Sequence, residues 1–229
     1  MLARLLEIYQ TGDEHAGVLD LPQKFWPTPG QFLSCQRLDG YPQALTTPLF
    51  RVLGDKGRLN VGPLPNDWRS GEQFACSPPQ GNGFKLPRAA GRIALAAFDC
   101  TPARITSLIE PALAQDASVA LFCQPLPASE YLNRLPAVVE IGTISALAEN
   151  LTWPDFLAIA IERDKLSQLT EFFGHVELRF DAQVLVQTDL PCHGIGECGV
   201  CAVKTHRGWR LACTDGPVFA LEEVRHVAQ

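Results

Sequence analysis

Four cysteines near the C-terminus constrain this chain more than any other feature. They are Cys192, Cys198, Cys201 and Cys213, with the spacing C-x5-C-x2-C-x11-C. Disulfide frameworks are typical of short secreted chains, whereas clustered cysteines in a cytosolic protein bind metal. The spacing therefore predicts a metal centre within residues 192–213. The other four cysteines are widely scattered, and we expect them to be buried as small apolar side chains.

The chemistry of this segment favours iron and sulfide. Thiolates are the soft, anionic ligands that sulfide-bridged iron prefers, and a two-iron cluster takes two for each iron. Glycines can adopt positive φ and bring backbone N–H groups close to anionic sulfurs, and the segment contains Gly194, Gly196 and Gly199. We therefore expect a [2Fe-2S] cluster on the four cysteines, with the glycine-containing loop as its cradle.

Two other interpretations of the cysteines stay open. A structural zinc site is one, although it would be favoured by two C-x2-C pairs and the chain has a single such pair. A redox-active disulfide without metal is the other. His193 lies inside the loop and is a potential ligand of the kind found in Rieske centres, but four thiols are already available.

Charge and hydropathy exclude two classes of partner. The net charge is −6, which gives no electrostatic support for binding a phosphate backbone. No apolar run approaches the length of a membrane-spanning helix, and the N-terminus lacks a small-residue cleavage site. We expect a cytoplasmic protein that binds neither nucleic acid nor membrane.

The chain divides into three regions that differ in composition and in hydrophobic pattern. Residues 1–90 hold 10 of the 18 prolines and 10 of the 18 glycines, between short apolar stretches, which predicts a small antiparallel β-barrel or sandwich. Residues 91–174 alternate strand-like and helix-like segments, which predicts a parallel, Rossmann-like α/β domain. Residues 175–229 are expected to form a small β-rich module around the cysteines. The fold class is therefore α+β with three regions.

The segments expected in the second and third regions can be placed by periodicity and turn residues. Strands are expected at Arg92–Phe98 and at residues 118–122, 138–141, 156–161, 176–180, 183–187 and 209–212. Helices are expected at residues 105–113, 130–135, 144–151 and 164–173, the last of these ending at Gly174.

The tail resembles a known family. Residues 198–219, CGVCAVKTHRGWRLACTDGPVF, closely resemble the cluster-binding tail of the electron-transfer subunit of B-type dihydroorotate dehydrogenase. The PGQF and GNGFKLP segments, at residues 29–32 and 81–87, resemble the beginning and the end of that family's barrel. The resemblance implies a ferredoxin-reductase-type barrel, a nucleotide-binding domain and a [2Fe-2S] module. It also implies electron transfer between NAD and the flavin of a partner, through FAD and the cluster.

The chain departs from the family at three cofactor positions. Where the family has arginine, proline, a variable residue and serine for FAD, residues 47–50 read Thr-Pro-Leu-Phe. The first strand-to-helix turn, at residues 97–102, contains Asp99 and no glycine. The family's Cys-Gly-Pro turn is replaced by residues 161–164, Ile-Glu-Arg-Asp, and Gly142 is the single glycine between residues 92 and 173.

We therefore expect a non-catalytic electron-transfer subunit whose cluster exchanges electrons with a partner oxidoreductase, itself a flavoprotein. NAD binding is expected to be lost, and FAD binding with it, although retention of FAD through other contacts stays open. Trp209 is expected to shield the cluster. Two alternatives remain: a working reductase that oxidises NADH through FAD and a [2Fe-2S] cluster, and a zinc-stapled structural interaction protein.

Overall fold

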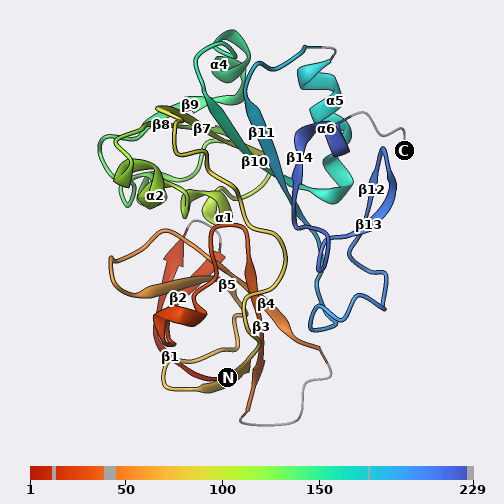
Figure 1. Cartoon of the computed structure of the whole chain (residues 1–229). Helices are drawn as coiled ribbons and strands as arrows, with labels where there is room; N and C mark the ends of the chain where they lie inside the picture. Colours follow the sequence, from red (N-terminus) through yellow and green to blue (C-terminus); the bar gives the residue numbers. More distant parts are fainter. Residues whose placement is uncertain (12–13, 39–44, 175, 226–229) are drawn as a thin grey trace.

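The computed structural model describes residues 1–11, 14–38, 45–174 and 176–225. Its N-terminal part is a closed antiparallel barrel with the strand order β1-β2-β5-β4-β3-β6 (Figure 1). The barrel strands are β1 Leu2–Thr11, β2 Glu14–Asp20, β3 Phe32–Arg37, β4 Thr47–Arg51, β5 Leu59–Leu64 and β6 Gln73–Cys76, with the short helix η1 at Gln23–Phe25.

The barrel forms because its short strands alternate apolar and polar residues. In β1, Ala3 and Leu5 are buried while Arg4 is exposed, as the period of two in a strand requires. The inward residues meet Trp68 and Phe74, whose rings lie 4.0 Å apart between centroids. The predicted antiparallel β-structure of this region is confirmed, and it closes as a barrel.

The second part is a six-stranded sheet with the order β14-β11-β10-β7-β8-β9. Five neighbouring strands are parallel, and β14 is an antiparallel edge strand. Its strands are β7 Arg92–Phe98, β8 Ser118–Gln124, β9 Glu140–Thr143, β10 Phe156–Glu162, β11 Asp181–Gln187 and β14 Val218–Ala220. The central strands β7 and β10 are apolar and buried along nearly their whole length, which is typical of a parallel sheet covered on both faces.

Helices cover both faces of this sheet. Figure 1 shows α1 and α2 on the face toward the barrel, with α4 and α5 on the opposite face. The helices are α1 Ala103–Thr106, α2 Ile109–Ala114, α3 Ser129–Leu132, α4 Ile144–Glu149, α5 Ser167–Phe173 and α6 Leu221–Val224, with η2 at Arg163–Lys165. α5 ends at Gly174, whose φ is +50°, as the sequence predicted.

Three expectations about local structure need correction. Residues 176–180 form no strand. The strand β11, which we placed in the third region, pairs in parallel with β10 because Val184, Leu185 and Val186 are buried in the core of the α/β sheet. The helix expected at residues 105–113 is two helices. Pro111 lies in the first turn of α2, where backbone N–H groups have no partner within the helix, so proline costs no hydrogen bond there.

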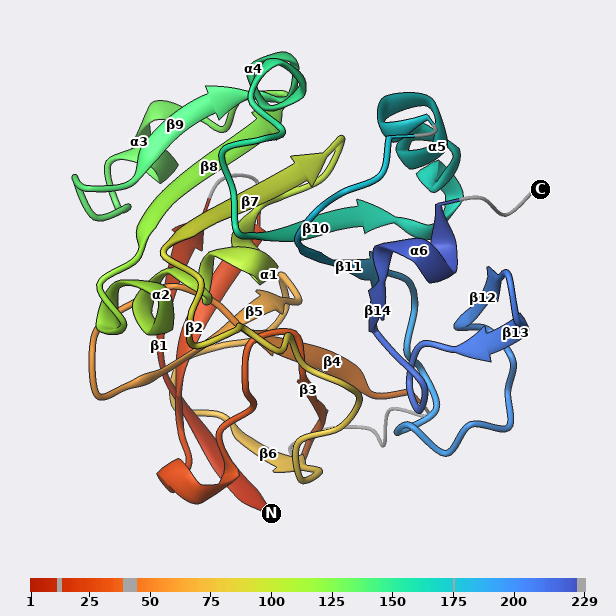
Figure 2. The same ribbon diagram turned by 45° about the horizontal axis from the view of Figure 1, so that its top comes forward.

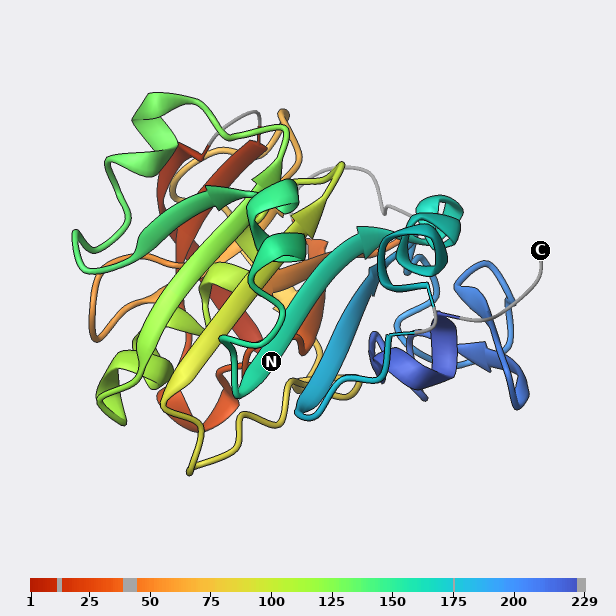
Figure 3. The ribbon, with the colours of Figure 1, turned by 90° about the horizontal axis from the view of Figure 1, so that it is seen from above.

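The remaining hairpin, β12 Ala202–Thr205 and β13 Gly208–Leu211, lies between β11 and β14 in the chain. In space it sits near β14 and α6, at the edge of the sheet opposite to β9 (Figure 2). Viewed from above, it projects beyond β11 and away from the barrel (Figure 3). The cysteine segment is therefore an insertion at one edge of the α/β sheet.

Two of the four scattered cysteines form a disulfide. Cys35 on β3 and Cys76 on the neighbouring strand β6 are buried, face each other in the strand register and are joined by a disulfide. Cys123 is buried, whereas Cys100 is half-buried. Burial was predicted for all four, and the disulfide was not. Among the described residues, no helix is both long and apolar enough to cross a membrane.

Candidate metal centre

The structure brings the four clustered cysteines to one place. Cys192 follows β11, Cys198 and Cys201 precede β12, and Cys213 follows β13. The sulfurs form two pairs: the Sγ atoms of Cys201 and Cys213 lie 3.3 Å apart, and the thiols of Cys192 and Cys198 are neighbours that shift each other's pKa. The two pairs interact electrostatically.

The two pairs differ in burial. Cys201 and Cys213 are 1% and 3% exposed, beneath the hairpin. Cys192 is half-buried and Cys198 is exposed. One side of the centre is therefore enclosed by protein, and the other faces the surface.

Backbone N–H groups of the loop lie near the Cys192 thiol, and the N–H of Ile195 donates to the carbonyl oxygen of Cys192 at 3.1 Å. Burial raises the pKa of this thiol, but the backbone N–H groups of the loop, chiefly that of Gly196, together with the Cys198 thiol, outweigh burial and lower the pKa to about 7. Gly194, Gly196 and Gly199 have φ of +75°, +81° and +71°. The positive φ that we expected at these glycines is confirmed.

The Cys213 thiol has the opposite environment. Burial, and then the neighbouring Cys201, raise its pKa to about 12. Burial and a neighbouring thiol both make the thiolate form of Cys213 unfavourable in the absence of a metal. A bound metal cation would reverse this, because its positive charge stabilises the thiolate that coordinates it. Among the described residues, no three His, Cys, Asp or Glu side chains form a group that fits a single metal ion.

The loop around the centre is fastened to other parts of the fold. Nη1 of Arg163, just after β10, donates to the carbonyl oxygen of Val200 at 2.6 Å. The backbone N–H of Thr46, just before β4, donates to the carbonyl oxygen of Pro191 at 3.4 Å. Sequence reasoning did not find these anchors, because they join residues far apart in the chain.

The turn after β7, where open α/β sheets bind their ligands, carries an acidic side chain and borders a cavity of about 410 Å³. Asp99 has a φ of +46°. Its Oδ2 accepts a hydrogen bond from Nε2 of Gln168, and its carbonyl oxygen accepts one from Nζ of Lys165, both at 2.8 Å. The ring of Phe98 contacts that of Phe172 edge-on, with 5.1 Å between centroids.

The barrel strand that carries residues 47–50 faces an arginine from α1. The guanidinium of Arg104 lies over the ring of Phe50, 4.9 Å from its centroid. Burial lowers the pKa of Arg104, and its Nε has no hydrogen-bond partner. A cavity of about 260 Å³ lies beside it, at the carboxyl ends of β10 and β11. Sequence reasoning missed Arg104 because Phe50 is distant in the chain.

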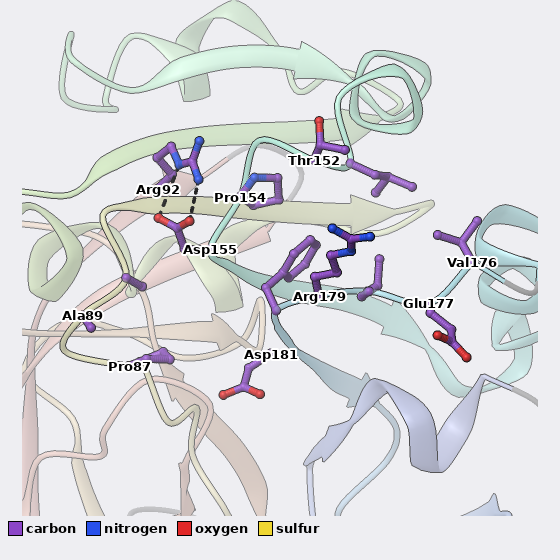
Figure 4. Close-up of a pocket in the computed structure, with 14 residues that line it drawn as sticks. Pro87, Ala89, Arg92, Thr152, Pro154, Asp155, Val176, Glu177, Arg179 and Asp181 are labelled. Atoms are coloured by element: carbon purple, nitrogen blue, oxygen red, sulfur yellow. Dashed lines mark hydrogen bonds and ion pairs between the residues drawn. The ribbon is translucent and has the colours of Figure 1, made fainter.

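Two cavities of about 700 Å³ or more lie elsewhere. One of about 740 Å³ is at the amino ends of β7, β10 and β11, beside the ion pair of Arg92 and Asp155 (Figure 4). This is the end of the sheet opposite to that used for ligands in open α/β folds, and we assign it no function. The other, of about 700 Å³, runs between α5 and the hairpin beside Trp209. Trp209 is 69% exposed, so it gives little of the shielding that we expected.

Comparison with known proteins agrees with this architecture. Residues 192–225 match the family described as the iron-sulfur cluster binding domain of dihydroorotate dehydrogenase B. The electron transfer subunit of dihydroorotate dehydrogenase B (NAD(+)) from Clostridium acetobutylicum is 22% identical over 223 residues, covering 90% of this chain and 89% of that protein. The resemblance found in the sequence is confirmed, and the family match supports an iron–sulfur cluster on this segment.

Solved structures show the same fold. The NADH-dependent reduced ferredoxin-NADP oxidoreductase superposes with a TM-score of 0.73 at 16% identity, over 98% of this chain and 90% of that one. Ferredoxin-NADP+ reductase from Plasmodium falciparum superposes with a TM-score of 0.59 at 9% identity, over 81% of this chain and 95% of that one. The chain therefore has a ferredoxin-reductase fold with a C-terminal iron–sulfur domain.

Proposed function

We propose that this chain is an electron-transfer subunit that carries a [2Fe-2S] cluster on Cys192, Cys198, Cys201 and Cys213. The pairing of the sulfurs carries the proposal. A two-iron cluster needs two thiolates for each iron, and the thiols are grouped two and two. A structural zinc ion needs four ligands arranged tetrahedrally about one point.

The surroundings of the thiols fit such a cluster. When bound, it supplies one-electron oxidation and reduction. The N–H groups of Gly194 and Gly196 would offset the negative charge that would gather on the Cys192 side. The buried pair, Cys201 and Cys213, would be kept from solvent, while exposed Cys198 would lie on the side from which an electron leaves.

We further propose that NAD binding is lost. A pyrophosphate at the turn after β7 needs close backbone approach and unpaired N–H groups. At this turn it would meet the Asp99 carboxylate, which Gln168 already holds in place, while the positive charge of nearby Lys165 is already paired with Glu162. These residues do not fit a dinucleotide.

The same proposal extends to FAD. The resemblance places the pyrophosphate-binding arginine of this family at Thr47, which has no charge to pair with phosphate. One face of Phe50, on the same strand, is covered by the guanidinium of Arg104. A flavin ring and Arg104 would compete for that face.

The partner is proposed to be an oxidoreductase subunit that docks beside the cluster. The relative from Clostridium is named as a subunit. Apolar side chains are exposed on the cysteine loop and its hairpin: Ile195 is 63% exposed, Val200 43% and Trp209 69%. Exposed apolar residues gathered in one place are typical of a protein interface. The barrel and the α/β sheet would act as the scaffold that presents this surface.

Anaerobic purification followed by iron, sulfide, zinc and flavin analysis tests the proposal. We expect about two irons and two sulfides per chain, an EPR signal on reduction, and no flavin. Cys198→Ser should lose the signal, whereas Cys123→Ser, its matched control outside the loop, should keep it. Zinc without iron would refute the cluster, and stoichiometric FAD would refute the scaffold role.

A kinetic assay separates this proposal from that of a working reductase. NADH-driven reduction of ferricyanide should be absent, because the turn after β7 presents the Asp99 carboxylate where a nucleotide phosphate would bind. Sustained turnover would instead support an enzyme that oxidises NADH.

A further inference from the structure

A three-residue segment at the end of the barrel, residues 80–82, contacts both halves of the cysteine centre. Nε2 of Gln80 donates to the carbonyl oxygen of His193 at 2.6 Å. Nδ2 of Asn82 donates to the carbonyl oxygen of Asp215 at 2.6 Å, and the backbone N–H of Asn82 donates to the carbonyl oxygen of Gly216 at 2.5 Å. Cys192 directly precedes His193, and Cys213 lies just before Asp215.

Gln80 is itself held rigidly by the barrel. Its backbone exchanges two hydrogen bonds with Phe32 on β3, at 2.8 and 3.2 Å. Its Oε1 accepts a hydrogen bond from Oγ of Ser34 at 2.9 Å. The amide group that meets His193 is therefore fixed in both position and orientation.

The contact with His193 controls where the next N–H points. In a trans peptide the C=O and N–H bonds point in opposite directions. Because the His193 carbonyl points out to Gln80, the N–H of Gly194 points the other way, toward the side of the loop that carries Cys192. His193 needs this support, since its φ of +55° is unfavourable for a residue with a Cβ.

We infer that Gln80 and Asn82 are positioning residues for the iron–sulfur cluster: they clamp the Cys192 loop and the Cys213 turn to the barrel, and Gln80 tunes the reduction potential through the Gly194 N–H. This inference rests on the proposed function. A hydrogen bond to a cluster sulfur stabilises the reduced state, which carries the extra negative charge. Loss of the clamp therefore moves the potential in the negative direction.

The test is redox titration of the cluster by EPR in three variants. Gln80→Met keeps the length of the side chain and removes the donor. We expect its reduction equilibrium constant to fall up to about tenfold, which is about 59 mV for one electron. Ser34→Ala loosens Gln80 without touching the loop and should shift the potential less, in the same direction. Asn82→Ala should lose its cluster to a chelator about fivefold faster, the factor expected for one hydrogen bond.

Gln115→Ala is the matched control. Nε2 of Gln115 also donates to main-chain carbonyls, those of Pro87 and Ala90, but away from the cysteines. It should leave the potential and the EPR spectrum unchanged. Wild-type potentials in both Gln80→Met and Ser34→Ala would overturn the inference while leaving the proposed function intact. A wild-type protein without iron would overturn both.

Discussion

Replacing single glycines in the cysteine loop tests whether the contact with Gln80 stabilises the fold. Gly194 and Gly199 have nearly the same positive φ, +75° and +71°. A Cβ added at Gly194 would lie 2.7 Å from Oε1 of Gln80, whereas one added at Gly199 would meet nothing within 4 Å. Gly194→Ala and Gly199→Ala therefore share one backbone cost and differ in a single steric contact.

The expected magnitudes follow from these contacts. Forcing alanine into the left-handed region costs about 1 kcal/mol once the smaller entropy of the unfolded chain is included. At Gly194 the methyl group must also displace the Gln80 amide, which loses its hydrogen bonds to His193 and Ser34, each contributing about 1 kcal/mol. Gly194→Ala should therefore destabilise by about 3 kcal/mol and Gly199→Ala by about 1 kcal/mol.

Thermal unfolding of samples with matched iron content measures this difference. For a chain of this length, about 2 kcal/mol corresponds to a Tm that is about 4–8 °C lower in Gly194→Ala than in Gly199→Ala. In a double-mutant cycle, Gln80→Ala should remove most of the extra cost, giving a coupling of about 2 kcal/mol. Equal Tm values for the two glycine variants, or additive costs in the cycle, would refute the reasoning.

Three further predictions concern the rest of the fold. Leu95→Ala, at a fully buried position in central strand β7, should cost about 3 kcal/mol in urea unfolding, whereas Leu126→Ala, at a side chain that is 50% exposed, should cost almost nothing. Mass spectrometry of unfolded, metal-free protein should find six alkylated cysteines without reductant and eight after reduction, because Cys35 and Cys76 are joined; eight before reduction would exclude the disulfide. The hydrogen bond from Arg92 lowers the pKa of Asp155 below its ordinary 3.8. The Arg92–Asp155 pair therefore stabilises the fold above about pH 4, and this contribution is lost as the pH falls further. In Asp155→Asn, the free energy of unfolding should fall less steeply with acid pH than in wild type, and an unchanged slope would contradict the assignment.

The sequence predicted those parts of the fold that depend on local pattern. β7 occupies the expected residues, Arg92–Phe98, because a continuous apolar run between turn residues has few alternatives in a parallel sheet. The position of β11 within the α/β sheet was not predicted. Its pairing with β10 crosses a helix and a loop, and the same alternation would suit a strand in a separate module.

The site divides in the same way. The four cysteines and the positive φ of the three loop glycines could be predicted, because ligand chemistry and backbone freedom are properties of residue types and their spacing. The anchors could not be predicted. Gln80 and His193 are 113 positions apart, and Arg104 meets Phe50 through the packing of α1 on the barrel. Neither contact leaves a local pattern.

These anchors give a physical reason for the fold to persist without nucleotide binding. In the proposed scaffold, the buried apolar strands β7 and β10 stabilise the α/β sheet without help from a cofactor. The cysteine loop is different, because much of it is exposed and its hairpin pairs only with itself among the described strands. Its shape depends on Gln80, Asn82 and the backbone of Thr46 from the barrel, together with Arg163 from the α/β sheet. A barrel that no longer held FAD would therefore still be needed to hold the loop in which the proposed cluster lies.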